Sequence, residues 1–234
     1  MRAIEQAQTL VISGAGLEDG LLPEGMKADI IDASTGIHLL CGTDHHDHDN
    51  DHGHTHNHDP HIWLSPENAR KMAENIYIGL SQSYPQYADT FNANYLKLCG
   101  EFNQLVLHAR QTLDGLSSRK LVTFHDGFSY MAQAWDLELL HSLEEESGSE
   151  ASAGELIELC ELVRYHNLPA VFTEKGGSVS AAEILTRETG VPAFALDMAM
   201  SGDSYFKAMY HNIATLKEAL GWILAPMAEA AAIP

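Results

Sequence analysis

The stretch Lys120-Leu-Val-Thr-Phe-His-Asp-Gly127 determines the fold class, because it begins a regular alternation of short apolar runs and helical patterns. Its apolar residues predict a strand over 120–124, and the glycine marks the turn into a helix over 127–134. The order then repeats, with strands predicted at 137–143, 170–173 and 193–196 and helices at 152–166, 180–189 and 205–220. This alternation is typical of right-handed βαβ units around a parallel sheet. We therefore predict a C-terminal α/β lobe over 117–234.

The N-terminal part shows a shorter version of the same pattern. Apolar runs predict strand segments at 9–13, 29–32 and 37–41. Ser65 is a preferred N-cap residue and Pro66 follows at the first helical position, so a helix is expected to begin there. These elements predict an N-terminal α/β lobe over 1–85, also with mainly parallel strands flanked by helices.

One long helix is expected between the two lobes, over residues 86–116. Its apolar residues recur every three or four positions: Phe91, Tyr95, Leu98, Phe102, Leu105, Ala109 and Leu116. A helix of this length extends for about 45 Å, more than the width of one small domain. We predict that it joins the lobes. An isolated coiled-coil segment is the weaker alternative, because the helix leads directly into the next α/β pattern.

The composition excludes several classes of protein. The chain has 234 residues, with 13 Lys and Arg against 33 Asp and Glu, a formal net charge of −20 and 45% hydrophobic residues. Such a chain is globular, and phosphate backbones would repel it, so nucleic acid is not expected as a partner. Neither a membrane span nor an export signal is predicted. Cys41, Cys99 and Cys160 are too widely spaced for a disulfide framework or a zinc ribbon, and predict buried free thiols.

Histidine is the unusual residue, with eight of the 14 lying between His45 and His61. The tract 44–59 holds seven His and five Asp and has no apolar periodicity, which predicts a solvated loop. Imidazole ligands suit Zn²⁺ better than Mn²⁺ or Mg²⁺, which prefer oxygen. The tract therefore predicts several weak zinc sites, unless it is a metal-binding tag without a role. The histidines concerned are His45, His46, His48, His52, His54, His56 and His58.

Four polar residues are stronger candidates for a defined metal site. His125, Glu174 and Asp197 each follow an apolar run, and the carboxyl ends of parallel strands are where such sheets bind ligands. Taken one at a time, each could instead be a helix cap or a turn residue. His125 also has apolar neighbours that would keep the site dry and a nearby carboxylate, Asp126, to support its ring. His61 leaves the His-rich tract between Pro60 and a bulky apolar run, which would give its ring a defined orientation, unless it is simply the last histidine of the tract.

These residues occur in motifs whose order resembles that of the zinc/manganese solute-binding proteins of ABC uptake systems. The most specific motif is Asp59-Pro-His-Ile-Trp-Leu-Ser-Pro-Glu-Asn-Ala69 beside the His-rich loop. The supporting motifs are Leu10-Val-Ile-Ser-Gly-Ala-Gly-Leu-Glu18, Phe124-His-Asp-Gly-Phe128, Phe172-Thr-Glu174, Leu196-Asp197 and Tyr210-His-Asn-Ile213.

The resemblance implies two α/β lobes joined by one long rigid helix, with the metal in the cleft between them. It carries the second, third and fourth metal ligands of the family onto His61, His125 and Asp197. The histidine at the third position is similar to the zinc branch of the family, because the manganese branch usually has glutamate at this position. Compared with the family, the N-terminal lobe is expected to be incomplete and to lack the first histidine ligand. The remaining position would then fall to water, to Glu174 or to a loop histidine.

The resemblance also implies a function without catalysis. We expect a monomeric zinc receptor outside the cytoplasm, either periplasmic or a cell-surface lipoprotein, that captures Zn²⁺ and delivers it to an ABC permease. Two alternatives stay open. A zinc-dependent hydrolase could use a three-ligand site with a bound water. A zinc buffer or metallochaperone could act through the His-rich loop alone.

Overall fold

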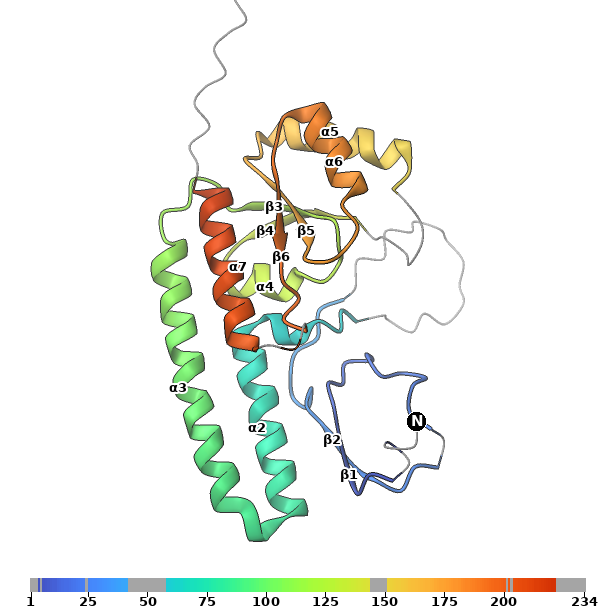
Figure 1. Cartoon of the computed structure of the whole chain (residues 1–234), viewed down its shortest axis with the longest axis vertical. Helices are drawn as coiled ribbons and strands as arrows, with labels where there is room; N and C mark the ends of the chain where they lie inside the picture. The colour runs from blue at the N-terminus through green and yellow to red at the C-terminus, as the bar shows by residue number, and fades with distance from the viewer. Residues whose placement is uncertain are drawn as a thin grey trace, which may run out of the picture. The chain divides into compact units, whose positions relative to one another are not determined.

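The computed structural model describes residues 4, 6–23, 25–41, 58–143, 151–200, 202 and 204–221. It separates into two compact units. Unit 1 comprises Met1–His108 with Gly127–Ala134, and unit 2 comprises Ala109–Asp126 with Trp135–Pro234. Both contain parallel strands flanked by helices, so the predicted α/β class is confirmed (Figure 1). The predicted loop 44–59 lies outside the described residues except for His58 and Asp59.

Unit 1 contains a small parallel sheet and most of the long helix. The elements of this part of the chain are β1 (Thr9–Ile12), β2 (Asp29–Asp32), the 3-10 helix η1 (Ile62–Leu64), α2 (Pro66–Ser83), the 3-10 helix η2 (Pro85–Tyr87), α3 (Ala88–Leu113) and α4 (Ser129–Ala134). The strands pair in parallel, with Leu10 beside Ile30. As predicted, α2 begins at Pro66, and the Ser65 hydroxyl caps it by accepting a hydrogen bond from the Asn68 N–H at 3.3 Å.

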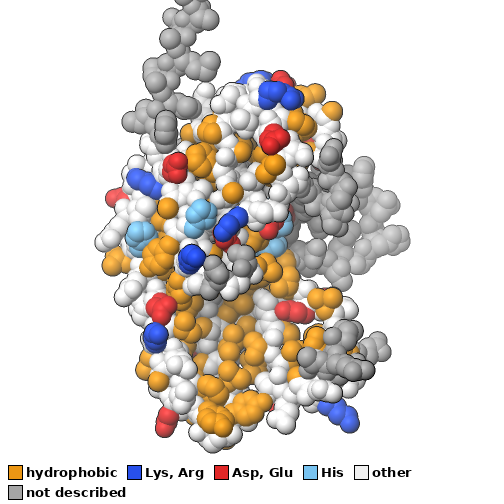
Figure 2. All heavy atoms as spheres, in the orientation of Figure 1, with side chains coloured by type: hydrophobic (Ala, Val, Ile, Leu, Met, Phe, Trp, Pro, Cys, Tyr) orange, Lys and Arg blue, Asp and Glu red, His pale blue; other side chains and the backbone are white. Residues whose placement is uncertain are grey.

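A glycine allows α2 to pack closely on β2. A Cβ atom placed on Gly79 would lie 2.7 Å from the side chain of Ile31, a residue that is buried beneath the helix. Figure 2 shows hydrophobic side chains gathered over α2, and Ile78 on this helix is one of the exposed apolar residues. The close contact fixes the spacing between helix and strand.

The strand predicted at 37–41 is wrong. The structure has only an isolated antiparallel bridge there, between Cys41 and His58. The reason lies in the backbone of Leu40: its N–H donates to the Tyr130 hydroxyl at 2.9 Å and its carbonyl accepts from the Asp59 N–H at 3.1 Å. A side chain and one neighbouring segment therefore satisfy this backbone, and no further strand pairs with it among the described residues.

The long helix α3 spans Ala88–Leu113, close to the predicted range, and contributes residues to both units. Its three- and four-residue spacing places Phe102, Leu105 and Ala109 in the buried part of the helix, while Leu96 and Leu107 are exposed. The amphipathic pattern in the sequence therefore reports a helix with one packed side.

Unit 2 has a four-stranded parallel sheet with the order β4-β3-β5-β6. Its elements are β3 (Lys120–Thr123), β4 (Glu138–Ser142), α5 (Ala153–His166), β5 (Val171–Glu174), α6 (Ser180–Thr189), β6 (Ala193–Leu196) and α7 (Tyr205–Leu220). They agree with the predicted alternation to within one or two residues. The start of α5 is a complete capping box, in which Ser152 and Glu155 each bind the other's backbone N–H.

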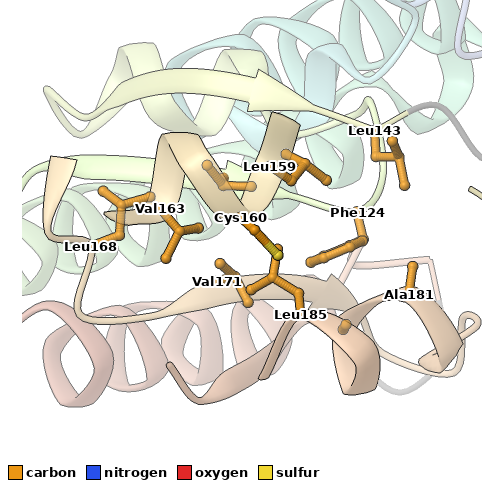
Figure 3. Packing of buried hydrophobic residues seen from close by; sticks show 11 residues of the cluster. Phe124, Leu143, Leu159, Cys160, Val163, Leu168, Val171, Ala181 and Leu185 are labelled. Atoms are coloured by element: carbon orange, nitrogen blue, oxygen red, sulfur yellow. The ribbon is translucent and has the colours of Figure 1, made fainter. Parts of the chain in front are cut away.

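The core of unit 2 explains this order. Figure 3 shows apolar side chains from the sheet, including Phe124 and Val171, pointing toward Leu159 of α5 and Leu185 of α6. Cys160 is buried in this cluster, whereas Cys99 is half-buried and Cys41 is exposed, so burial was predicted correctly for one of the three free thiols. None of the described helices is long and apolar enough to cross a membrane.

Candidate metal centre

His61 of unit 1 has its ring oriented by the carboxylate of Asp59. The Asp59 Oδ1 atom lies 2.8 Å from His61 Nδ1 and also accepts the His61 backbone N–H at 2.9 Å. A carboxylate at Nδ1 favours the tautomer that carries its proton there, and this leaves the lone pair on Nε2. The ring is also in edge contact with Trp63, with centroids 5.5 Å apart. Histidine ligands of metals are usually held in this way.

Asp59 is itself fixed by the surrounding backbone and by Tyr130. The Asp59 side chain is only 4% exposed, and its carbonyl accepts a hydrogen bond from the Tyr130 hydroxyl at 3.1 Å. Burial raises the pKa of Tyr130 above its ordinary value, so the phenol stays protonated and able to donate. Contacts with Leu40 and Tyr130 thus hold the backbone of Asp59, from which its carboxylate reaches the imidazole of His61.

In unit 2, three predicted residues lie at one edge of the sheet. His125 comes two residues after β3, Glu174 is the last residue of β5, and Asp197 directly follows β6. These strands are parallel neighbours in the order β3-β5-β6, so their carboxyl ends meet at the same edge. The sheet therefore brings to one edge nitrogen- and oxygen-bearing side chains that are far apart in the sequence.

The carboxylate of Glu174 lies beside the ring of His125. The Nδ1 atom of this ring lies 3.6 Å from Glu174 Oε2, an electrostatic contact that is too long for a hydrogen bond. Asp126, the neighbour expected to support this ring, accepts a hydrogen bond from the Ser142 hydroxyl at 2.9 Å. Phe124 and Phe128, the apolar neighbours of His125 in the chain, are both buried.

Asp197 is buried and tightly held. Its backbone N–H donates to Asn212 Oδ1 at 2.7 Å, and its carbonyl accepts from Asn212 Nδ2 at 2.8 Å. Its Oδ1 atom accepts the Ala199 N–H at 2.8 Å, and its Oδ2 atom accepts from Lys175 Nζ at 2.9 Å. Burial acts to raise the pKa of Asp197, but the hydrogen bonds from Lys175 and Ala199 outweigh it and hold the pKa below its ordinary value. The carboxylate is therefore charged at neutral pH.

Two residues of this site were not recognised as functional from the sequence. Lys175 stands directly after Glu174, so its position after a strand was the available signal. Asn212 is completely buried on α7 among apolar residues, and a polar residue on the packed side of a helix was a signal of the same kind.

Within the described part of the chain, no group of three or more His, Cys, Asp or Glu side chains lies close enough together to hold a metal. His61 belongs to unit 1, and His125, Glu174 and Asp197 belong to unit 2. Of the loop histidines, only His58 is described, in its bridge to Cys41. The other six lie outside the described residues: His45, His46, His48, His52, His54 and His56.

Comparison with known proteins identifies the class. The family of the zinc-uptake complex component A, ZnuA, described as periplasmic, matches residues 1–219. The chain therefore belongs to the ZnuA family of zinc solute-binding proteins of ABC transporters.

Individual relatives agree with this assignment. A ZnuA deletion mutant with zinc bound has a TM-score of 0.80 and 27% identity, covering 94% of this chain and 82% of that one. A Zn(II)-bound mutant variant of AdcAII from Streptococcus pneumoniae has a TM-score of 0.78 and 26% identity, covering 94% and 82%. The zinc-binding lipoprotein AdcA of S. pneumoniae is 30% identical over 168 residues, which are 68% of this chain and 34% of AdcA. The chain thus spans about a third of the length of the AdcA relatives that it matches.

Family membership confirms that the chain is a solute-binding protein and not an enzyme. It overturns the zinc-dependent hydrolase that the sequence left open. Zinc binding, zinc transport and a periplasmic or lipoprotein setting are properties of this family.

Proposed function

We propose that this protein captures Zn²⁺ with His61, His125 and Asp197 and delivers it to an ABC permease. In this proposal the two α/β lobes are joined by α3, and the ion is held in the cleft between them by one ligand from unit 1 and two from unit 2. In this proposal the chain acts as a monomer, and it acts outside the cytoplasm because its family is described as periplasmic and AdcA as a lipoprotein.

The contact between Asp59 and His61 carries the proposal. An imidazole with Nδ1 held by a buried carboxylate at 2.8 Å presents Nε2 in a fixed direction, and metal sites commonly use this arrangement. A histidine that merely ended a polar tract would not need such support.

The chemistry of the donors favours zinc over manganese. Two imidazoles and one carboxylate match the ligands that Zn²⁺ prefers, whereas Mn²⁺ prefers oxygen. The fourth position is left to Glu174, to a water molecule or to a histidine of the loop. A shell that a fourth protein ligand closes binds the ion without activating a water for chemistry.

Zinc titration against a chromophoric chelator tests the assignment. His125→Ala should abolish the tight site and leave only weak binding by the loop. His166→Ala is the matched control, because His166 lies on α5 beside Lys120 and away from the proposed ligands. Equal losses in both variants, or loss of all binding only when residues 44–58 are deleted, would contradict the cleft site and favour a zinc buffer acting through the loop.

Affinity should also depend on pH. Zinc binds deprotonated imidazole, so affinity should fall as the pH drops through about 6.5, the value of an unperturbed histidine. Asp59→Asn should weaken binding by about 10-fold, because the amide is a poorer partner for the imidazole N–H. The same zinc affinity at pH 5 and pH 7.5 would be inconsistent with histidine ligands.

Delivery can be tested in cells. In a bacterium that has lost its own zinc receptor but keeps the permease, the exported protein should restore growth in zinc-depleted medium. His125→Ala should not restore growth at equal protein levels. If the unaltered protein and His125→Ala restored growth equally, growth would not depend on zinc capture by His125, and the proposed site would be contradicted.

A further inference from the structure

The carboxylate proposed to bind zinc already has a cationic partner inside the same unit. Lys175 Nζ lies 2.9 Å from Asp197 Oδ2, and the lysine side chain is 57% exposed while that of the aspartate is 6% exposed. The other carboxylate oxygen, Oδ1, accepts the Ala199 N–H, so Oδ2 is the oxygen that a bound metal would share with this ammonium group. Figure 2 shows cationic, acidic and histidine side chains near one another on the face of the molecule where Figure 1 draws α7.

Asp197 does not depend on Lys175 for its position. Asn212 binds both its backbone N–H and its carbonyl, and the Ala199 N–H binds the other carboxylate oxygen, Oδ1. With three contacts holding the residue, the ammonium contributes charge rather than orientation.

The Lys175 side chain is able to move while its backbone stays in place. Its backbone N–H donates to the Leu196 carbonyl at 2.8 Å, which continues the pairing of β5 with β6. Lys175 and Asp197 also line a cavity of about 400 Å³, together with Tyr205 and His211 of α7. A displaced ammonium group therefore has room to leave without disturbing the sheet.

We propose that Lys175 is an internal competitor of the metal, which occupies Asp197 Oδ2 in the metal-free protein and must be displaced when zinc binds. This inference rests on the proposed function, because it assumes that Asp197 is a zinc ligand. A buried carboxylate without a partner is unfavourable, so the lysine keeps Asp197 paired before capture and again after release. The competition lowers zinc affinity and eases transfer of the ion to the permease.

Lys175→Met removes the competitor and should raise zinc affinity by about 5- to 10-fold, between the values for an exposed ion pair and for a hydrogen bond to a charged group. The zinc-dependent rise in Tm should grow as well, because the metal-free variant has an unpaired carboxylate. Lys71→Met is the matched control: it removes the same charge from the ion pair of Lys71 with Glu74 at 2.7 Å, in unit 1, and should leave zinc affinity unchanged. Unchanged or weaker zinc binding by Lys175→Met would overturn the competition.

A measurement on the unaltered protein avoids dependence on a variant. Acylation of Lys175, followed by mass spectrometry, should become several-fold faster when zinc is added, while acylation of Lys71 should not change. Equal rates with and without zinc would refute displacement. Asp197→Asn distinguishes the zinc site from the competition. If Asp197→Asn leaves zinc affinity unchanged, the proposed zinc site is wrong. If Asp197→Asn weakens zinc binding but Lys175→Met does not strengthen zinc binding, the site stands and only the competition by Lys175 is wrong.

Discussion

Asn212→Ala should destabilise unit 2 more than any other single polar truncation discussed for this protein. The Asn212 side chain is fully buried and makes two hydrogen bonds to the backbone of Asp197, at 2.7 and 2.8 Å. Truncation leaves a buried N–H and a buried carbonyl without these partners. Each such group costs about 1–3 kcal/mol, so the expected loss is about 2–6 kcal/mol in the free energy of unfolding. For a protein of ordinary stability, about 5–15 kcal/mol, this is a large fraction.

The matched control is Asn75→Ala in unit 1. Asn75 also donates two hydrogen bonds to backbone carbonyls, those of Ala33 and Thr35, both at 2.8 Å. Asn75 is only half-buried and Thr35 is exposed, so water can replace at least the bond to the Thr35 carbonyl, and the loss should be about 1 kcal/mol.

Urea unfolding of the zinc-free proteins, followed by circular dichroism, measures both losses. The reasoning requires that Asn212→Ala cost at least about 1 kcal/mol more than Asn75→Ala. Equal losses would show that the buried backbone of Asp197 finds other partners, and would refute the role of Asn212 in holding this residue.

Two further predictions concern stability alone. Gly79→Ala should destabilise the protein by about 1 kcal/mol, because the new Cβ would lie 2.7 Å from the Ile31 side chain, and this clash outweighs the better helix propensity of alanine. Gly100→Ala on α3 is the control: its Cβ meets nothing within 4 Å, so it should stabilise the protein by about 0.5–1 kcal/mol. In thermal unfolding, Gly79→Ala should lower the Tm and Gly100→Ala should raise it. A change of Tm in the same direction for both would contradict the close packing of α2 on β2. Ser152→Ala should cost about 1 kcal/mol at pH 7 through loss of the α5 cap. The Ser152 hydroxyl and, to a smaller extent, its backbone N–H lower the pKa of Glu155. Part of the cost of Ser152→Ala should therefore disappear as the pH falls below about 4 and Glu155 is protonated. A cost that grows toward acid pH would argue against this coupling of Ser152 and Glu155.

Most of the secondary structure could be predicted because its signals are local. Periodic apolar residues predicted the α/β order of unit 2, and the cap Ser65 marked the start of α2 correctly. The prediction of a strand at 37–41 was wrong, although the apolar residues there match the local pattern of a strand. Only a distant partner strand would have made this segment a strand, and Leu40 is bound instead by Tyr130 and Asp59.

The candidate ligands could be chosen from the sequence for a similar reason. A polar residue after an apolar strand is visible without tertiary structure, which is how His125, Glu174 and Asp197 were selected. The contact of His125 with Glu174, on the adjacent strand, was not visible in the sequence. Adjacency across a sheet depends on strand order, and one sequence does not encode that order in any short pattern.

The amino-acid sequence by itself determined the α/β class, the His-rich tract, the motif around His61 and the residues that end each strand, because each of these is a property of neighbouring residues. Only the tertiary structure decided what those residues contact. Lys175 and Asp197 are 22 residues apart and meet because β5 and β6 pair in parallel. Asn212 reaches Asp197 because α7 packs on β6. The charge and position of the proposed zinc ligand in unit 2 therefore depend on contacts that arise only when the chain folds.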